Sequence, residues 1–177
     1  NRKENFKILK FEIISFKEGL MEGEKKIQYK EHQENKGSVI RSELIHQEGL
    51  RFIGISNTNH AIILDSKKEH GGFESANSPM ELVSIALMGC TAMDVISILR
   101  KMRENVSDFR VFFEGIRANE HPKVFTDIKL VFQFKGNNLK YENLEKAVRL
   151  SYEKYCSVIN MLKKSVNIQY EIKVIEE

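Results

Sequence analysis

The chain has 177 residues, of which 41% are apolar and 30% are charged, and it contains two cysteines. This composition suits one globular domain with an appendage, and it excludes both an intrinsically disordered chain and a disulfide-rich scaffold. Lysine and arginine exceed aspartate and glutamate by 28 − 25 = 3, and the two signs are interspersed along the chain. The clustered basic face that nucleic-acid binding requires is therefore not predicted.

The longest nearly uncharged stretch runs from Leu82 to Met93 and is interrupted by Asp94. It is shorter than the roughly 20 helical residues that cross a bilayer, so no membrane span is predicted. Residues 1–10 contain no apolar signal core. We therefore expect a cytoplasmic protein, and in a reducing compartment a cysteine pair more often serves chemistry than cross-linking.

Residues 1–37 are predicted to be an N-terminal extension of unknown role, followed by one domain over residues 38–177. The apolar pattern of the extension fits a strand or a helix about equally. Beyond it, short β-rich runs separated by turn-forming residues predict an antiparallel meander of three strands. These strands are expected at Val39–His46, Arg51–Ser56 and Ala61–Asp65.

A helix is predicted to begin after Ser78 and to run to about Arg103. Ser78 as the cap, Pro79 at the first helical position and Glu81 at the third form a complete helix-start signature. The first four turns have almost no polar face, so we expect this helix to be buried on all sides. One sheet covers only one side of a helix, and a second subunit is therefore expected to supply the missing cover.

Alternating apolar residues predict two long paired strands over residues 108–118 and 124–134. A helix is expected from about Tyr141, with a break and restart near Cys156 and a last strand over Asn167–Ile175. Because strands and helices do not alternate strictly, a doubly wound parallel sheet is not expected. The prediction is an α+β fold with an antiparallel sheet wrapped around the central hydrophobic helix.

The two cysteines occupy contrasting positions, Cys90 within the apolar helix and Cys156 at the break between two helical runs. Either one alone is most simply a small buried hydrophobic residue. Gly89 is unfavourable inside a helix, which indicates that another segment approaches the backbone beside Cys90. A free thiol is only about 3% ionised at pH 7 and burial lowers that fraction, so a reactive Cys90 needs a nearby cation.

Charged neighbours are expected to affect the two thiols unequally. Asp94, one turn after Cys90, disfavours a Cys90 thiolate if it shares that face. The start of a helix favours the thiolate of Cys156. Arg51, which opens a strand, is the best-placed candidate cation, although a solvated strand-end arginine is an equally good interpretation. The five histidines show no metal-ligand spacing and no CxxC pair is present, so no metal site is predicted.

Several longer segments carry a family resemblance. They are Ser78-Pro79-Met80-Glu81-Leu82, Gly89-Cys90-Thr91-Ala92-Met93-Asp94-Val95, Ile98-Leu99-Arg100-Lys101, His121-Pro122-Lys123-Val124-Phe125-Thr126, Glu153-Lys154-Tyr155-Cys156-Ser157-Val158 and Leu162-Lys163-Lys164. Together they resemble the OsmC/Ohr family of osmotically inducible and organic hydroperoxide resistance proteins, and most of all its OsmC-like, YhfA-type subgroup. The resemblance covers about residues 44–175 and leaves residues 1–37 outside it.

The resemblance implies an OsmC/Ohr-like fold in which two chains form an intertwined homodimer with its sites at the interface. It also implies a thiol-dependent peroxidase that reduces organic hydroperoxides to alcohols. Cys90 would then be the peroxidatic cysteine that becomes a sulfenic acid, and Cys156 the resolving cysteine that closes an intrachain disulfide. An external dithiol or lipoyl-type reductant would reopen this disulfide, and no bound cofactor is expected.

Members of this family hold the reactive thiolate with an arginine from an early strand, which a glutamate at the start of the central helix positions. Arg51 matches that arginine by resemblance. Glu81 stands nine residues before Cys90, whereas the family pattern has ten, and Met80 occupies that position. One residue turns a helix by about 100°, so Glu81 is explained slightly better as the capping-box residue than as a site residue.

Two alternatives to a peroxidase stay open at this point. The first is a non-catalytic dimer of the same fold that binds an apolar small molecule in the interface cleft. The second gives residues 1–37 the role of docking a partner protein. Neither the identity of the hydroperoxide nor that of its physiological reductant follows from the residues.

Overall fold

The structure is a computed structural model that describes residues 39–175, so the predicted extension at 1–37 lies outside the described residues. The described elements belong to the compact unit of residues 40–177. In chain order they are β1 (Ser42–Glu48), β2 (Arg51–Ser56), β3 (Ala61–Leu64), the 3-10 turn η1 (Lys68–His70), α1 (Pro79–Lys101), β4 (Val106–Arg117), β5 (Phe125–Gly136), α2 (Tyr141–Leu150), the π-helical turn η2 (Ser151–Tyr155), α3 (Ser157–Leu162) and β6 (Asn167–Ile175).

The first three strands form the predicted antiparallel meander, in the order β1-β2-β3. Gly49 makes the turn between β1 and β2 with a φ of +58°, and a Cβ there would lie 2.7 Å from the Gly71 carbonyl oxygen. This turn therefore requires glycine. Several apolar side chains of this sheet are exposed in the single chain, namely Leu44, Ile62 and Ile63.

The second sheet has the order β4-β5-β6 and is mixed rather than wholly antiparallel. Strands β4 and β5 pair antiparallel as predicted, whereas β6 runs parallel to β5. The segment between β5 and β6 contains α2, η2 and α3, which is the long helical crossover that parallel neighbours require. The expectation of a purely antiparallel sheet is therefore wrong for the last strand, although the α+β class is confirmed.

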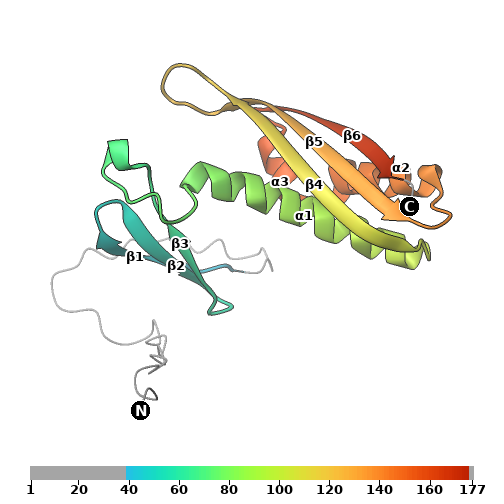
Figure 1. The fold of residues 1–177 in the computed structure, drawn as a ribbon, viewed down its shortest axis with the longest axis horizontal. Helices are drawn as coiled ribbons and strands as arrows, with labels where there is room; N and C mark the ends of the chain where they lie inside the picture. Colours follow the sequence, from blue (N-terminus) through green and yellow to red (C-terminus); the bar gives the residue numbers. More distant parts are fainter. Residues whose placement is uncertain (1–38, 176–177) are drawn as a thin grey trace, which may run out of the picture. The chain divides into compact units, whose positions relative to one another are not determined.

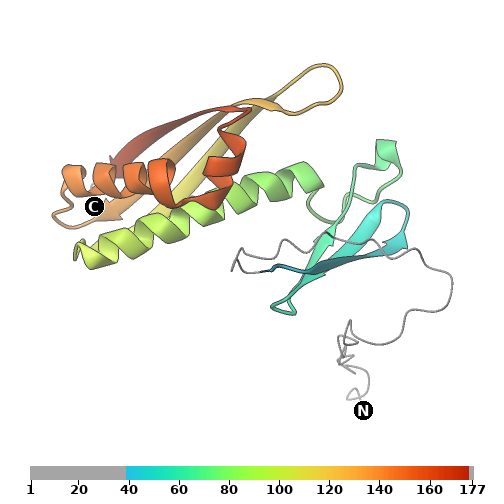
Figure 2. The ribbon, with the colours of Figure 1, turned by 180° about the vertical axis from the view of Figure 1, so that it is seen from behind.

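The helices cover one face of the β4-β5-β6 sheet, with α1 and the α2–α3 segment side by side on it (Figures 1 and 2). The predicted alternation along β5 is confirmed, because every second side chain from Ile128 to Phe134 is buried. The core between sheet and helices consists mainly of Leu87, Val95, Leu99, Ile128, Leu130, Phe132, Phe134, Leu144, Ala147, Val148, Ile159 and Ile168. The two cysteines lie against this same core.

Helix α1 begins where its start signature predicts and buries a narrower stripe than its composition suggests. Its fully buried residues, Leu87, Thr91, Val95 and Leu99, are spaced four apart on one face. On other faces, Ile85 is 46% exposed and Met93 is 77% exposed. The expectation that this helix is buried on all sides is therefore not met within one chain, because a single sheet and α2–α3 cover only part of it.

The length and composition of α1 also satisfy the requirements of a membrane span. Over an 18-residue window its mean hydropathy is 2.1, and 22% of that window is buried. The single carboxylate of Asp94 does not disqualify a longer apolar window, so a stretch that ends at Met93 understates the apolar length of α1. One such helix is a weak indication of a membrane, since the core helix of a soluble protein has the same length and composition.

Candidate functional site

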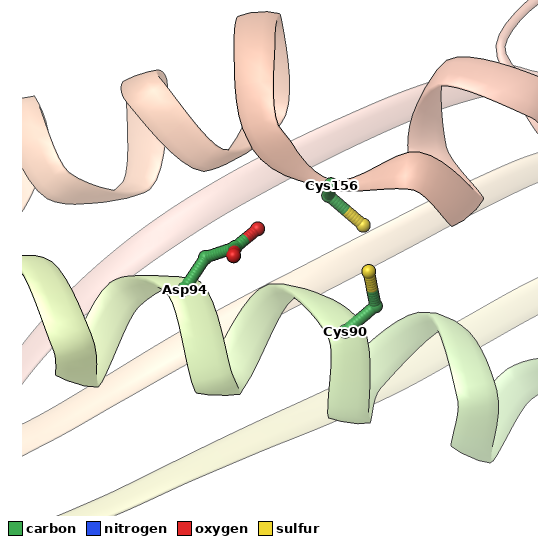
Figure 3. A group of neighbouring side chains, drawn as sticks. All are labelled: Cys90, Asp94 and Cys156. Atoms are coloured by element: carbon green, nitrogen blue, oxygen red, sulfur yellow. The ribbon is translucent and has the colours of Figure 1, made fainter. Parts of the chain in front are cut away.

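Two thiols from distant parts of the chain face each other inside the helical layer. Cys90 extends from the middle of α1, and Cys156 extends toward it from the break between η2 and α3 (Figure 3). The two Sγ atoms and a carboxylate oxygen of Asp94 all lie within 4.8 Å of one another. Both cysteines are free thiols, Cys90 partly buried and Cys156 fully buried.

The predicted break near Cys156 is a π-helical turn followed by a new helix. Helix α2 carries its buried stripe of Leu144 and Val148 into η2, where the Cys156 N–H donates to the Ser151 carbonyl oxygen at 2.9 Å. Cys156 then leaves the helical conformation and caps α3, with the Ile159 N–H donating to its sulfur at 3.4 Å. A widened turn of this kind places one side chain out of the regular helical register, here toward α1.

The start of α3 does favour the Cys156 thiolate, because the Ile159 and Val158 N–H groups lower its pKa, but burial outweighs this effect, so the expected net direction is wrong. Desolvation by burial, and after it the hydrogen bond with Cys90, raise the pKa of Cys156 to about 12, and the Ile159 N–H, which acts to lower this pKa, offsets only part of the rise. Helix α3 has only six residues, so its dipole is small beside the loss of hydration. Cys156 therefore stays protonated across the physiological pH range.

Asp94 shares the helix face of Cys90, as the spacing of one helical turn predicted. Its Oδ2 accepts a hydrogen bond of 3.0 Å from the Ser151 hydroxyl, and Ser151 is fully buried. The sequence pattern did not identify Ser151 as a residue of the site. Only the packing of η2 against α1 brings this hydroxyl to the carboxylate.

Gly89 does not have the role that its helical position suggested. A Cβ added to Gly89 would meet no atom within 4 Å among the described residues. Within the described part of one chain, no other segment therefore comes close to the backbone at Gly89. The glycine costs helix stability without a packing reason in this structure.

Arg51 lies at the start of β2, with its guanidinium 4.9 Å from the centre of the Phe73 ring. Phe73 belongs to the loop between β3 and α1, and its N–H donates to the buried Asp65 carboxylate, which also accepts from Ser66 and Ser75. Burial acts to raise the pKa of Asp65, but these hydrogen bonds hold it below its usual range. Hydrogen bonds to the buried Asp65 carboxylate thus hold together the loop that contains Phe73, on which Arg51 packs.

Glu81 makes the capping box at the start of α1. Its Oε2 accepts hydrogen bonds from the Ser78 N–H at 2.6 Å and from the Ser78 hydroxyl at 2.7 Å. The Glu81 N–H donates to the Ser78 oxygen at 3.4 Å, and the bonds from Ser78 lower the pKa of Glu81. In this chain the Glu81 carboxylate therefore has a structural task, as its displacement by one residue indicated.

The arrangement at Cys90 and Cys156 can support thiol–disulfide chemistry. Two opposed sulfurs need only local movement to reach the S–S bond length of about 2.05 Å. A separate hollow of about 370 Å³ lies at the C-terminal end of α1, lined by residues that include Leu99, Arg100, Glu104 and Phe109. Neither Cys90 nor Cys156 lines that hollow.

Comparisons with known proteins agree on the family and the fold. The family described as OsmC-like protein matches residues 72–171. Protein YhfA of Escherichia coli K12 is 44% identical over 128 residues, which are 72% of this chain and 92% of that protein. A hypothetical protein from Aquifex aeolicus VF5 has a similar structure, with 32% identity, a TM-score of 0.70, and coverage of 80% of this chain and 99% of that chain. An organic hydroperoxide resistance protein OsmC from Legionella pneumophila shares the fold at 14% identity, with a TM-score of 0.58 and coverage of 77% of this chain and 97% of that chain.

Proposed function

The chain belongs to the OsmC-like protein family, and from this premise we propose that it is a thiol-dependent peroxidase that reduces organic hydroperoxides to alcohols. The observation that carries this proposal is the opposed pair of free thiols from α1 and the η2–α3 break. Structural relatives described as organic hydroperoxide resistance proteins support the substrate class. In a reducing compartment, cysteines that lie close together also tend to serve chemistry.

In the first step, the Cys90 thiolate attacks the distal oxygen of the hydroperoxide. A sulfur–oxygen bond forms, the O–O bond breaks, and the leaving alkoxide takes up a proton to become the alcohol. Cys90 is then a sulfenic acid, which is the reversible first stage of thiol oxidation. Cys90 suits this role because it is partly exposed, whereas Cys156 is fully buried and remains protonated.

In the second step, the Cys156 sulfur displaces the hydroxyl group from the Cys90 sulfenic acid. The hydroxyl leaves as water with the proton that Cys156 gives up, and an intrachain disulfide remains. An external dithiol, of small-molecule or lipoyl type, then reduces the disulfide and restores both thiols. No bound cofactor is needed for any of these steps.

We propose further that the working form is a homodimer in the cytoplasm, with each site completed at the interface. In support, the most apolar helix leaves Ile85 and Met93 exposed in the single chain, and the first sheet exposes Leu44, Ile62 and Ile63. Apolar surface of this extent is typical of a face that another chain covers. A second chain would also cover the faces of α1 that the β4-β5-β6 sheet leaves exposed.

Mixing the reduced full-length chain with cumene hydroperoxide in a stopped-flow instrument tests the peroxidase. We expect one equivalent to be consumed much faster than free cysteine consumes it, because the site orients and activates one thiol. Mass spectrometry should then show the loss of two hydrogens per chain and a peptide that links Cys90 to Cys156. Consumption at the rate of free cysteine, with no such peptide, would favour the family fold as a binding module for apolar molecules.

Arg51 is proposed to be the cation that stabilises the Cys90 thiolate at the completed site. Replacing it by alanine should lower the rate of Cys90 oxidation at pH 7 by about 10- to 100-fold, since an adjacent opposite charge shifts an ionisation by about one to two units. The pH at which the rate is half-maximal should move upward, and Arg51→Lys should recover part of the loss. Arg110→Ala is the matched control, because Arg110 is an exposed arginine paired with Asp108. If the pH profile of Arg51→Ala is unchanged, Arg51 does not stabilise the Cys90 thiolate, and its contact with the Phe73 ring is its remaining role.

A further inference from the structure

The surroundings of the thiol pair contain a third group that peroxide reduction does not use. The carboxylate of Asp94 lies beside both sulfurs, and all three atoms are within 4.8 Å of one another (Figure 3). Asp94 does not stabilise a thiolate, because its own charge has the same sign. Its position therefore calls for a different explanation from that of the cysteines.

The three side chains have the identity and arrangement of a metal-binding set. Cys90 and Asp94 stand one helical turn apart on the same face of α1, and Cys156 adds a third donor from the opposite segment. Tetrahedral zinc, with Zn–S of about 2.3 Å and Zn–O of about 2.1 Å, places two sulfurs about 3.8 Å apart and a sulfur and an oxygen about 3.6 Å apart. In the structure the two sulfurs and the Asp94 oxygen lie within 4.8 Å of one another, so small side-chain rotations bring them to these distances.

The outer contacts of this set are also those of a metal site. The buried Ser151 hydroxyl donates to Asp94 Oδ2 at 3.0 Å and so fixes the orientation of the carboxylate. The Ile159 N–H donates to the Cys156 sulfur at 3.4 Å, a contact that favours the sulfur as an anion. Hydrogen bonds of this kind orient the ligands of bound metals and tune their affinity.

We propose that the reduced protein binds one thiophilic divalent cation, with Zn²⁺ as the physiological ion, through Cys90, Cys156 and Asp94. The fourth position of the tetrahedron is left to water, as in zinc sites with three protein ligands. Two sulfurs exclude Mg²⁺ and Ca²⁺ as preferred ions, because those cations take oxygen ligands. Sequence spacing did not indicate this site, since its ligands combine a helical i, i+4 pair with a cysteine 66 residues further on.

The proposal goes beyond peroxide reduction and does not depend on it. The cation needs both sulfurs as thiolates, whereas a disulfide between them has no anionic sulfur to offer. Metal binding and disulfide formation therefore exclude each other. A protein with this pair would hold the cation when reduced and release it when oxidised.

Titration of the reduced full-length chain with Co²⁺, under anaerobic conditions and without any hydroperoxide, tests the site. We expect a sulfur-to-cobalt charge-transfer band that saturates at one equivalent and disappears when Zn²⁺ is added. Because the chain contains only two cysteines, this band can arise only from Cys90 and Cys156. The oxidised chain, with its disulfide closed, should give no band.

Variants separate the ligands from their neighbours. Competition for Zn²⁺ with a chromophoric chelator should show about a 10-fold or greater loss of affinity in Asp94→Asn and a loss of about 10- to 100-fold in Ser151→Ala. Asp108→Asn is the matched control, because Asp108 is an exposed carboxylate on β4 bound to Arg110, and its affinity should equal that of the unaltered chain. Asp94→Asn is nearly isosteric, so it decides the matter even if the buried Ser151→Ala variant fails to fold.

Two results would overturn the proposal. One is the lack of a charge-transfer band in the reduced chain, and the other is an Asp94→Asn variant that holds Zn²⁺ as tightly as the unaltered chain. Either result leaves the peroxidase proposal intact, because hydroperoxide consumption is measured separately in the presence of a chelator. Conversely, a chain that consumes no hydroperoxide can still bind Co²⁺ with the expected band.

Discussion

Replacing Cys90 by serine is expected to lower the second-order rate of cumene hydroperoxide consumption by about 10³-fold or more. The serine hydroxyl has nearly the shape of the thiol but does not ionise near neutral pH and cannot form a sulfenic acid. Cys156 cannot take over, because burial keeps it protonated, with a pKa of about 12. Stopped-flow measurements at pH 7, with thermal unfolding recorded in parallel, give the rate and show that the variant is folded.

A relocated thiol is the control for Cys90→Ser. Ser97 is an exposed residue of the same helix, and the double variant Cys90→Ser/Ser97→Cys restores the number of thiols at a position about two helical turns from Cys90. Its rate should not exceed that of free cysteine, since the site and not the thiol count provides the acceleration. Rapid consumption by Cys90→Ser alone would assign the peroxidatic role to Cys156 and would invert the order of the two steps.

Much of the fold could be predicted because its local signals are strong. The capping box of Ser78 and Glu81 located the start of α1, and the period-two pattern of β5 identified its buried face. The parallel pairing of β6 with β5 could not be predicted, because strand direction depends on how the α2–α3 crossover packs. The exposure of Ile85 and Met93 on α1 likewise could not be predicted, because the composition of a helix alone does not say which of its faces are covered.

The candidate site divides in a similar way. Motifs identified Cys90 and Cys156, and helical periodicity placed Asp94 on the face of Cys90. The hydrogen bond from Ser151 to Asp94 was not predictable, because it joins two helices through tertiary packing. The ionisation of Cys156 was predicted with the wrong sign, since the rule for helix starts omits the desolvation that full burial causes.

The electrostatics of the site explain why the two proposals concern the same residues. The two thiols and the Asp94 carboxylate lie within 4.8 Å of one another, so three groups that can carry negative charge meet at one place. Such a cluster needs a cation in order to ionise, since like charges at short range disfavour one another. Under the two proposals, the Arg51 guanidinium would favour peroxide attack by Cys90, whereas a bound divalent cation would occupy both sulfurs and block that attack.

Replacing Cys156 by serine should preserve the first oxidation of Cys90 and abolish disulfide formation. Serine is a favourable helix cap, so its hydroxyl can accept the Ile159 N–H bond that the sulfur now accepts and α3 should remain folded. The Cys90 sulfenic acid then has no partner and should be trapped by dimedone in nearly every chain after one equivalent of hydroperoxide. With excess hydroperoxide, it should advance irreversibly to the sulfinic acid.

The same variant has a pH dependence of stability with a defined sign. Folding raises the pKa of Cys156 from an ordinary value of about 9 to about 12, so the folded chain retains a proton that the unfolded chain loses. The free energy of unfolding of the unaltered chain should therefore fall relative to that of Cys156→Ser as the pH rises from 9 toward 12. Denaturant unfolding under reducing conditions at several pH values measures this difference. If the difference in unfolding free energy stays constant across that pH range, Cys156 is not desolvated in the folded chain.

The trapping experiment has its own contradicting outcome. If Cys156→Ser still forms one disulfide per two chains, Cys90 pairs with the Cys90 of a second subunit and not with Cys156.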